Sequence, residues 1–361
     1  MNTKIHRTVI AVFAACLIVA IYFSARSNRQ IELDSGHRLV MGTFARTVVI
    51  AEDSNKAKKC IENAFAEIYK VDELMSDYKS DSEISQVNRD GFKKAIRLSK
   101  STYEVLQRSI DFSKLTDGAF DVTVGPLVDL FRKAKDKQVL PNEDEIALAK
   151  LKVGFEKLKL DDQNRTVQFA VEGMRLDLGG IAKGYAVDKA IEAMQRCGAI
   201  GGMVDIGGDI RCFGAPLKNK QHWLIGVQNP NLDKDIDERN LVLKLKLTNG
   251  AVATSGDYQQ FVLIEGKRHS HIIDRKTGKS AEGLSSVTII ADNATDADAL
   301  ATAVSVMGAE KGLALIEQLP TTEAILITSQ PKPVPADRRP VEIEVEGFEL
   351  IKTTGAEKYI K

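Results

Sequence analysis

The sequence predicts an α+β fold in which antiparallel or mixed sheets are flanked by helices. Some segments carry apolar residues at three- and four-residue spacing, as helices do, and others alternate apolar and polar residues, as half-exposed strands do. Tight-turn signals between strands indicate hairpins, which favour this class over a doubly wound parallel sheet. The 361 residues are 43% hydrophobic and show no internal repeat after Glu32. We therefore expect residues 31–361 to form one domain.

We expect residues 1–30 to be a targeting segment outside this domain. Lys4 and Arg7 precede an apolar run over residues 8–24, and a polar stretch follows it. The pattern fits a signal peptide or a retained membrane anchor. A lipoprotein signal at Cys16 ranks third because the chain stays apolar after it. All three alternatives place the folded part outside the cytoplasmic membrane, and we expect the protein at the periplasmic face of the inner membrane.

The first half of the domain is expected to contain a strand and two helices. Residues 39–50 alternate well enough for one strand, which includes the tripeptide Met41-Gly42-Thr43. Residues 56–76 carry apolar side chains on one helical face, which predicts a core-facing helix. A second helix over residues 101–115 is expected to end before Gly118, since glycine often terminates helices.

The second half is expected to contain further strands around one long helix. Alternating leucines at residues 241–247, followed by Asn249-Gly250, predict a β-hairpin with residues 251–254. A helix that begins near Thr295 is expected between two strands. Those two strands, a proline-rich link and a last strand are expected at residues 287–290, 324–328, 331–340 and 341–345.

Charge and cysteine spacing argue against several classes of protein. Lysine plus arginine equals aspartate plus glutamate, 50 against 50, whereas a general nucleic-acid-binding protein carries a basic surplus. We therefore expect no nucleic-acid partner. The four cysteines lie far apart without a CxxC pair, which indicates neither a zinc site nor a disulfide framework. We expect Cys16, Cys60, Cys197 and Cys212 to be mostly buried thiols.

Two segments suggest a site for a nucleotide diphosphate and a metal ion. Residues 177–190 are predicted to be a strand end, a glycine turn and a helix start with a lysine, an arrangement that directs backbone N–H groups and a cation at a phosphate. Asp298 and Thr302 lie one helical turn apart, and their oxygens suit magnesium. A backbone carbonyl of the Gly179-Gly180 turn could complete the set of ligands. Alternatively, the glycines form an ordinary turn, and Asp296 and Asp298 lie in the first turn of a helix, where acidic side chains interact favourably with the helix dipole.

Other candidate residues have a structural alternative beside the functional one. His271 precedes a turn at residues 274–278 and is a candidate proton acceptor or a structural histidine. Asp257 is a similar candidate or a turn former. Tyr78 either stacks on a planar ring or covers the core. The loop at residues 118–121 places an aromatic ring beside a carboxylate.

As an ordered set, eight segments between about Met41 and Gly308 resemble the ApbE family of FAD-dependent flavin transferases. The segments are MGT from Met41, MSDYKSDSEIS from Met75, GAFDVTVGPLV from Gly118, DLGGIAKGYAVD from Asp177, GGDI from Gly207, TSGDY from Thr254, HIID from His271 and DALATAVSVMG from Asp298. The resemblance implies a T-fold-like architecture. The glycine-rich segment from Asp177 is especially specific.

The resemblance implies a reaction and a set of site residues. FAD would be bound and its pyrophosphate split with Mg²⁺, so that the FMN half is attached by a phosphoester to a threonine or serine hydroxyl of an acceptor protein and AMP is released. The acceptor would belong to a membrane redox complex. The carbonyl of Gly180, the carboxylate of Asp298 and the hydroxyl of Thr302 would hold the ion, and His271 would act as base or position the substrate. The flavin nucleotide would be lined by Met41, Tyr78, Ala119, Phe120, Asp121, Asp177, Lys183 and Ile272.

Two other functions use the same residues. Water in place of the acceptor hydroxyl would make the protein an FAD pyrophosphatase, and binding without turnover would make it an FAD carrier. Three positions depart from the usual family pattern: Asp205 replaces an asparagine, and Val122 and Arg275 each replace a proline. None of these removes a metal ligand, but Arg275 is expected to loosen its turn and to shift His271.

Overall fold

The computed structural model describes residues 30–217, 220–230, 241–256, 261–328, 344–345 and 348–361. Its centre is a nine-stranded sheet in which all neighbouring strands are antiparallel. The strands, in spatial order, are β1 (Ile31–Val40), β2 (Thr43–Ala51), β6 (Gly201–Ile206), β7 (Asp209–Phe213), β10 (Gly250–Gly256), β15 (Leu284–Ala291), β16 (Glu323–Thr328), β18 (Phe348–Lys352) and β17 (Glu344–Val345).

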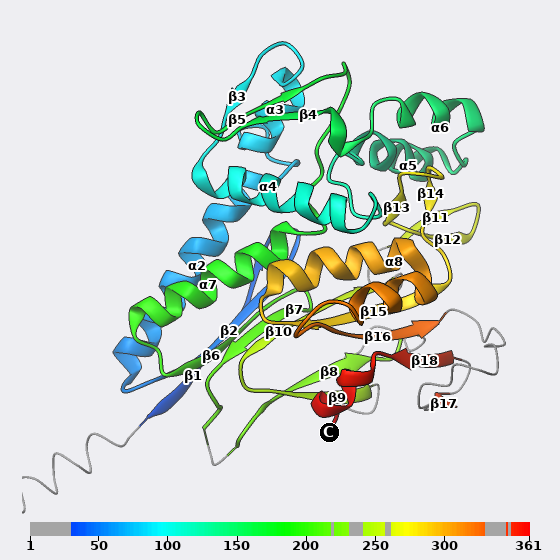
Figure 1. The fold of residues 1–361 in the computed structure, drawn as a ribbon. Helices are drawn as coiled ribbons and strands as arrows, with labels where there is room; N and C mark the ends of the chain where they lie inside the picture. The colour runs from blue at the N-terminus through cyan, green and yellow to red at the C-terminus, as the bar shows by residue number, and fades with distance from the viewer. Residues whose placement is uncertain (1–29, 218–219, 231–240, 257–260, 329–343, 346–347) are drawn as a thin grey trace, which may run out of the picture.

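Three long helices cover one face of this sheet (Figure 1). They are α2 (Ser54–Met75), α7 (Ala182–Cys197) and α8 (Ala294–Ile316). Alternate residues of β2, such as Ala45 and Val49, point toward the helices and join Phe65 and Leu300 in the main core. By length and composition α8 could cross a membrane, and no other helix among the described residues could. It packs against β10, β15 and α7, which makes it a core helix.

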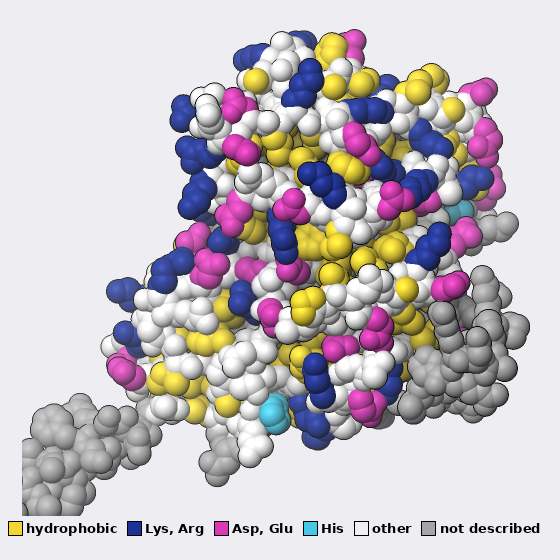
Figure 2. Space-filling view, in the orientation of Figure 1, with side chains coloured by type: hydrophobic (Ala, Val, Ile, Leu, Met, Phe, Trp, Pro, Cys, Tyr) yellow, Lys and Arg dark blue, Asp and Glu magenta, His cyan; other side chains and the backbone are white. Residues whose placement is uncertain are grey.

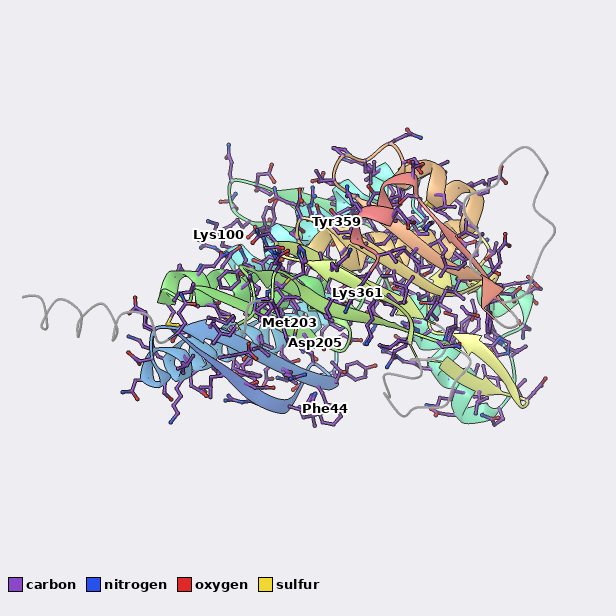
Figure 3. The ribbon with its side chains drawn as sticks, turned by 90° about the horizontal axis from the view of Figure 1, so that it is seen from below. Phe44, Lys100, Met203, Asp205, Tyr359 and Lys361 are labelled. Carbon is purple, nitrogen blue, oxygen red and sulfur yellow. A yellow bond between two sulfur atoms is a disulfide. The ribbon has the colours of Figure 1, made fainter. Side chains whose placement is uncertain are left out.

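The opposite face of the sheet carries a second core. The hairpin of β8 (Trp223–Gln228) and β9 (Leu241–Leu247) and the 3₁₀ helix η3 (Thr354–Tyr359) cover it, with Leu245 fully buried. Figure 3 views this face from below. Phe44 of β2 is 61% exposed there, so the hairpin covers only part of the face.

A third layer lies above the three long helices (Figure 1) and is built from shorter elements. Leu127 and Phe131 form its own small core with Ile273. The elements are α3 (Glu83–Asp90), β3 (Ile96–Arg97), α4 (Lys100–Leu115), α5 (Gly125–Lys137), α6 (Glu143–Lys150), η1 (Phe155–Lys157), β4 (Leu158–Asp161), β5 (Thr166–Phe169), β11 (Phe261–Ile264), β12 (Lys267–Ser270), β13 (Ile273–Asp274) and β14 (Lys279–Ser280). Basic and acidic side chains are interspersed over the described residues of the face in Figure 2.

Most predicted elements are confirmed, but the extent of one strand and the partner of another are wrong. The helices at 56–76, 101–115 and from 295, and the strands at 287–290 and 324–328, form as α2, α4, α8, β15 and β16. Residues 39–50 are two strands, because Met41 (φ 51°) and Gly42 (φ 71°) form a tight turn between β1 and β2.

The hairpin predicted between residues 241–247 and 251–254 is also wrong. β9 pairs with β8, whereas β10 lies between β7 and β15 in the main sheet. The buried leucines of β9 pack into the second core, and Gly250 (φ 133°) sends the chain on into the sheet. The predicted targeting segment, except residue 30, and the proline-rich link lie outside the described residues. So do Asp257 and most of the last predicted strand.

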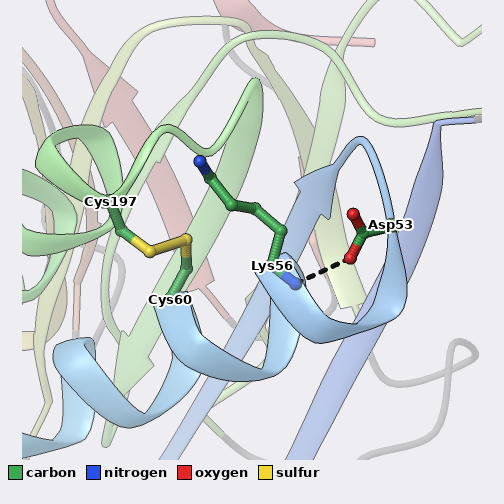
Figure 4. The surroundings of a disulfide bond; sticks show 4 residues. All are labelled: Asp53, Lys56, Cys60 and Cys197. Carbon is green, nitrogen blue, oxygen red and sulfur yellow. Dashed lines mark hydrogen bonds between the residues drawn. A yellow bond between two sulfur atoms is a disulfide. The ribbon is translucent and has the colours of Figure 1, made fainter. Parts of the chain in front are cut away.

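The expectation for the cysteines is wrong for one pair. Cys60 of α2 and Cys197 of α7 form a disulfide with a Cα–Cα distance of 5.5 Å (Figure 4). They are 137 residues apart in sequence and meet only because α2 and α7 pack side by side. Asp53, the N-cap residue of α2, accepts a hydrogen bond from the Lys56 N–H in the same region. Cys212 is a buried thiol, as predicted.

Candidate active site

The glycine turn at residues 177–180 leads directly into α7. The Asp177 carboxylate accepts a hydrogen bond from the Gly179 N–H at 2.9 Å, which shapes the turn. α7 has no side-chain cap of its own at Ile181. Instead, Oδ2 of Asp298 on α8 accepts the N–H of Gly184 at 3.0 Å. The turn and helix start are as predicted, but the strand before them is reduced to an isolated bridge at Arg175.

The packing of α7 against α8 brings the predicted metal ligands together. A Cβ atom added to Gly180 would lie 2.8 Å from Oγ1 of Thr302, so the two residues are in close contact. Asp298 is 3% exposed, and its Oδ1 lies 3.7 Å from Nζ of Lys183. Lys183 also pairs with Asp209 at the start of β7. The site therefore combines one lysine, two buried carboxylates, a hydroxyl and a glycine turn.

Burial dominates the electrostatics of these groups. It raises the pKa of Asp298 to about 7, and the nearby charge of Asp209 adds to the effect. The pKa of Asp209 is raised chiefly by burial as well. Burial lowers the pKa of Lys183, but attraction to Asp209 and Asp298 outweighs it, so the net shift is upward. Two buried carboxylates thus share one partly buried lysine.

The oxygens at this junction are of the kind that a hard cation accepts. Among the described residues no group of three or more histidine, cysteine, aspartate or glutamate side chains could hold a metal ion. An ion here must use carbonyl and hydroxyl oxygens in addition to one carboxylate, and magnesium accepts such a set together with waters or phosphate oxygens. A cation beside Asp298 would also offset the charge that burial makes costly.

The two acids at the start of α8 have different environments. Asp296 forms a bidentate ion pair with Arg108, with a shortest distance of 2.8 Å, at the protein surface. Asn293 caps the helix by accepting the N–H of Asp296. Asp298, in contrast, faces α7. Asp296 therefore fits the alternative of an acid in the first helical turn. Of these two acids, only Asp298 is still a candidate metal ligand.

Two aspartates that we did not list as site residues support this arrangement. Asp209 pairs with Lys183, and Asp188 of α7 accepts the N–H groups of Ala294 and Thr295 at 2.9 Å each. Asp188 also pairs with Arg211 of β7 at 2.7 Å. Both lie inside motifs that the sequence analysis quoted, so a buried acid within a specific motif was the available signal.

The turn between β1 and β2 approaches the same region. Gly207 donates its N–H to the carbonyl of Phe44 at 3.0 Å, and a Cβ at Gly207 would lie 2.8 Å from Oγ1 of Thr43. This contact places the turn that holds Met41 beside the β6–β7 turn that precedes Asp209. Asp205 accepts the Gly208 N–H at 2.9 Å. An asparagine oxygen could make the same bond, so this departure from the family pattern is conservative.

Tyr78 and Asp177 share a neighbour, Arg132. The guanidinium carbon of Arg132 lies 4.8 Å from the centre of the Tyr78 ring, and its Nη2 lies 3.6 Å from Oδ2 of Asp177. The Tyr78 side chain does not cover the core, because the residue is 79% exposed. Burial raises the pKa of Asp177, and the charge of Asp77 adds to it. The Tyr78 ring thus contacts Arg132 and is otherwise largely exposed.

Residues 119–121 serve the fold through their side chains. Phe120 is buried in an edge-to-face contact with Phe112. The Asp121 carboxylate accepts hydrogen bonds from the Thr123 N–H and hydroxyl at 2.8 and 2.6 Å, and from the Phe155 N–H at 3.0 Å. A ligand at this loop would therefore meet mainly Ala119 and main-chain atoms.

His271 and Ile272 lie in the bend between β12 and β13, with His271 exposed and Ile272 buried. The turn that follows forms as predicted, and the Gly278 N–H donates to the Asp274 carbonyl at 2.7 Å. The expectation that Arg275 loosens this turn is wrong, because Arg275 is held by Asp121 and Glu156. The role of His271 stays a prediction.

Comparison with known proteins identifies the family. Residues 41–326 match the model of the ApbE family. The chain belongs to the ApbE family. It is 35% identical over 286 residues to the FAD:protein FMN transferase of Haemophilus influenzae, covering 77% of this chain and 82% of the relative. It is 30% identical over 303 residues to the FAD:protein FMN transferase of Treponema pallidum, covering 80% and 83%.

Solved ApbE structures share the fold. The ApbE protein of Thermotoga maritima is 33% identical with a TM-score of 0.74, and the match covers 83% of this chain and 94% of that one. The flavin transferase ApbE of Vibrio cholerae is 30% identical with a TM-score of 0.74, over 92% and 99% of the two chains. The predicted α+β class and ApbE architecture are confirmed.

A glycine substitution tests whether this ApbE-family protein has the predicted metal site. In Gly180→Ala, the new methyl group would press on Oγ1 and Cγ2 of Thr302, at 2.8 and 3.2 Å. We expect Mg²⁺ affinity to fall by about 10- to 100-fold, as when a ligand's support is displaced. Titration of activity with MgCl₂ at saturating FAD measures it. Gly179→Ala is the matched control, because its methyl would approach only Asp177; equal Mg²⁺ affinity in both variants would contradict the prediction.

Proposed function

We propose that this protein transfers the FMN half of FAD to a threonine or serine hydroxyl of an acceptor protein, in a reaction that needs Mg²⁺ and releases AMP. Membership of the ApbE family supports flavin transfer as the class of reaction. The observation that carries the finer proposal is the junction of α7 and α8, where Lys183, Asp298, Thr302 and the Gly180 turn converge.

The residues of this junction would bind and orient the pyrophosphate. The Gly180 carbonyl, the Asp298 carboxylate and the Thr302 hydroxyl would hold Mg²⁺, which when bound neutralises charge on the phosphate oxygens. Lys183 would place a second positive charge beside the same oxygens. The flavin half would lie along Met41, Tyr78, Ala119, Phe120, Asp121, Asp177 and Ile272.

The reaction breaks one bond of the pyrophosphate and forms one phosphoester. The acceptor hydroxyl oxygen attacks the phosphorus of the FMN half, and the bond from that phosphorus to the oxygen bridging to AMP breaks. AMP leaves with the bonding electron pair. His271 would accept the hydroxyl proton, since a histidine titrates near neutral pH.

We further propose that the protein acts at the periplasmic face of the inner membrane, held there by residues 1–30. The Cys60–Cys197 disulfide supports an extracytoplasmic location, because such bonds persist in oxidising compartments and are rare in the cytosol. A membrane redox subunit with an exposed threonine or serine is the acceptor that this location favours.

A single incubation separates this function from its two alternatives. The purified protein is mixed with FAD, MgCl₂ and a redox-subunit domain that carries the acceptor threonine, with a Thr→Val domain as control. We expect a fluorescent, covalently labelled domain, one AMP per label and no label on the control. FMN and AMP without label would indicate a pyrophosphatase. Intact, bound FAD would indicate a carrier.

A further inference from the structure

We propose that Arg275 is a positioning residue that holds two walls of the flavin site at a fixed separation. One wall is the loop at residues 118–121, and the other is the bend at residues 271–272. The inference rests on the proposed function, because these two segments are flavin walls only if FAD binds there. Arg275 itself has no place in the transfer reaction described above.

The guanidinium group of Arg275 joins the two walls directly. Its Nη1 donates to Oδ2 of Asp121 at 2.8 Å, and its Nη2 donates to Oε1 of Glu156 at 2.9 Å. Nη1 also reaches the second oxygen of Glu156 at 3.1 Å, so the pair with Glu156 is bidentate. The guanidinium carbon lies 5.0 Å from the centre of the Phe155 ring. One side chain therefore connects the 273–280 hairpin, the 118–121 loop and η1.

The contact with Asp121 is buried, unlike an ordinary surface ion pair, whereas Glu156 is 56% exposed. The side chain of Arg275 is 16% exposed and that of Asp121 is 1% exposed. Burial raises the pKa of Asp121, and the Thr123 hydroxyl and N–H and the charge of Arg275 oppose that rise. Because exposed ion pairs are screened by water and contribute little, a buried and hydrogen-bonded pair is the one that can define a distance.

Gly118 leaves the space that this guanidinium fills. A Cβ atom at Gly118 would lie 2.3 Å from Nε and Nη2 of Arg275, so the guanidinium group would have to leave its present position to admit a side chain there. The glycine also adopts φ 75°, a conformation that other residues rarely take. Lys276, the next residue, pairs with Asp117 on the other side of the glycine. Arg275 and Lys276 of the hairpin thus form ion pairs with the loop on both sides of Gly118.

The geometry predicts what loss of Arg275 does. Ile272 lies three residues before Arg275, and Ala119 and Phe120 lie directly before Asp121. Without the buried Arg275–Asp121 pair, only the exposed Lys276–Asp117 pair would still join the walls through side-chain charges, and we expect the walls to be held less firmly. FAD would then bind less tightly, whereas the α7–α8 junction, which Arg275 does not contact in the described hydrogen bonds, would be intact. Removal of uniform binding raises KM and leaves kcat unchanged.

The test compares Arg275→Met, Arg275→Lys and a control, Arg38→Met. Arg38 makes a similar bidentate pair with Glu62 and stacks on Phe65, but it faces α2. FAD affinity is measured by flavin fluorescence without MgCl₂. We expect about tenfold weaker binding for Arg275→Met, partial recovery with lysine, no change for Arg38→Met and kcat within about threefold of wild type.

Hydrogen exchange supplies a readout that does not depend on FAD. In Arg275→Met without ligand we expect faster amide exchange at residues 118–121 and 271–275 only. Unchanged exchange there, or faster exchange throughout the chain, would overturn the proposal. If Arg275→Met does not fold, Glu156→Gln replaces it and is expected to shift both measurements in the same direction by less. If the wild-type protein binds no FAD, the proposed function is refuted instead. Hydrogen exchange still tests whether Arg275 holds the two segments together.

Discussion

Asp298→Asn is expected to lower Mg²⁺-dependent FMN transfer by about a thousandfold, because a lost metal ligand removes several kcal/mol of charge stabilisation. The carboxylate is 3% exposed and lies between Lys183 and the N–H of Gly184. An asparagine keeps the shape and still accepts the Gly184 N–H, so the fold is expected to survive. Initial rates of acceptor labelling at saturating FAD measure the effect.

Asp296→Asn is the matched control for this change. It removes a carboxylate two residues away on the same helix, but one that pairs with Arg108 at the surface. We expect wild-type labelling rates from this variant, since surface ion pairs contribute little. Thermal unfolding adds a second test, because Mg²⁺ should raise the melting temperature of wild type and Asp296→Asn but not of Asp298→Asn. Equal loss of activity in the two variants would refute the metal site.

The Cys60→Ser, Cys197→Ser double variant is expected to lose about 2–5 kcal/mol of unfolding free energy, the usual effect of removing a native disulfide. The bond closes a long loop, because its two cysteines are separated by 137 positions in the sequence, and a longer loop gains more from closure in the chain-entropy model. Because the bond joins α2 to the end of α7, the helix that carries Lys183 in its first turn is expected to become less firmly held. Urea unfolding with and without reductant measures the change.

Reductant provides the internal control for the disulfide. Dithiothreitol should bring the wild-type protein to the stability of the double variant and should leave the variant unchanged. Cys212→Ala, which alters the buried free thiol of β7, should keep its full sensitivity to reductant. If both Cys60 and Cys197 can be alkylated in the native protein without reductant, the assigned bond is absent and the expectation fails.

Local elements were predictable where a single helix face or a pair of neighbouring residues decides the structure. The spacing of Ile61, Phe65 and Ile68 predicted α2, and all three are buried as that spacing requires. Alternation continues on both sides of the Met41-Gly42 turn, so the pattern predicts one strand where the structure has two. The prediction that β9 pairs with residues 251–254 is wrong. Alternation shows that a strand has one buried face but does not show which strand lies beside it.

The sequence by itself determined the family and the α+β class, because ordered motifs and helical periodicity are local properties. Tertiary structure alone decided that Asp298, and not Asp296, faces α7, that Cys60 meets Cys197, and that Arg275 ties the loop at Asp121 to its own hairpin. The hydrogen bond from the Gly184 N–H to the Asp298 carboxylate joins residues that are 114 positions apart in the sequence. Which side chains meet over such distances depends on how helices pack on the sheet, and short-range periodicity carries no information about that packing.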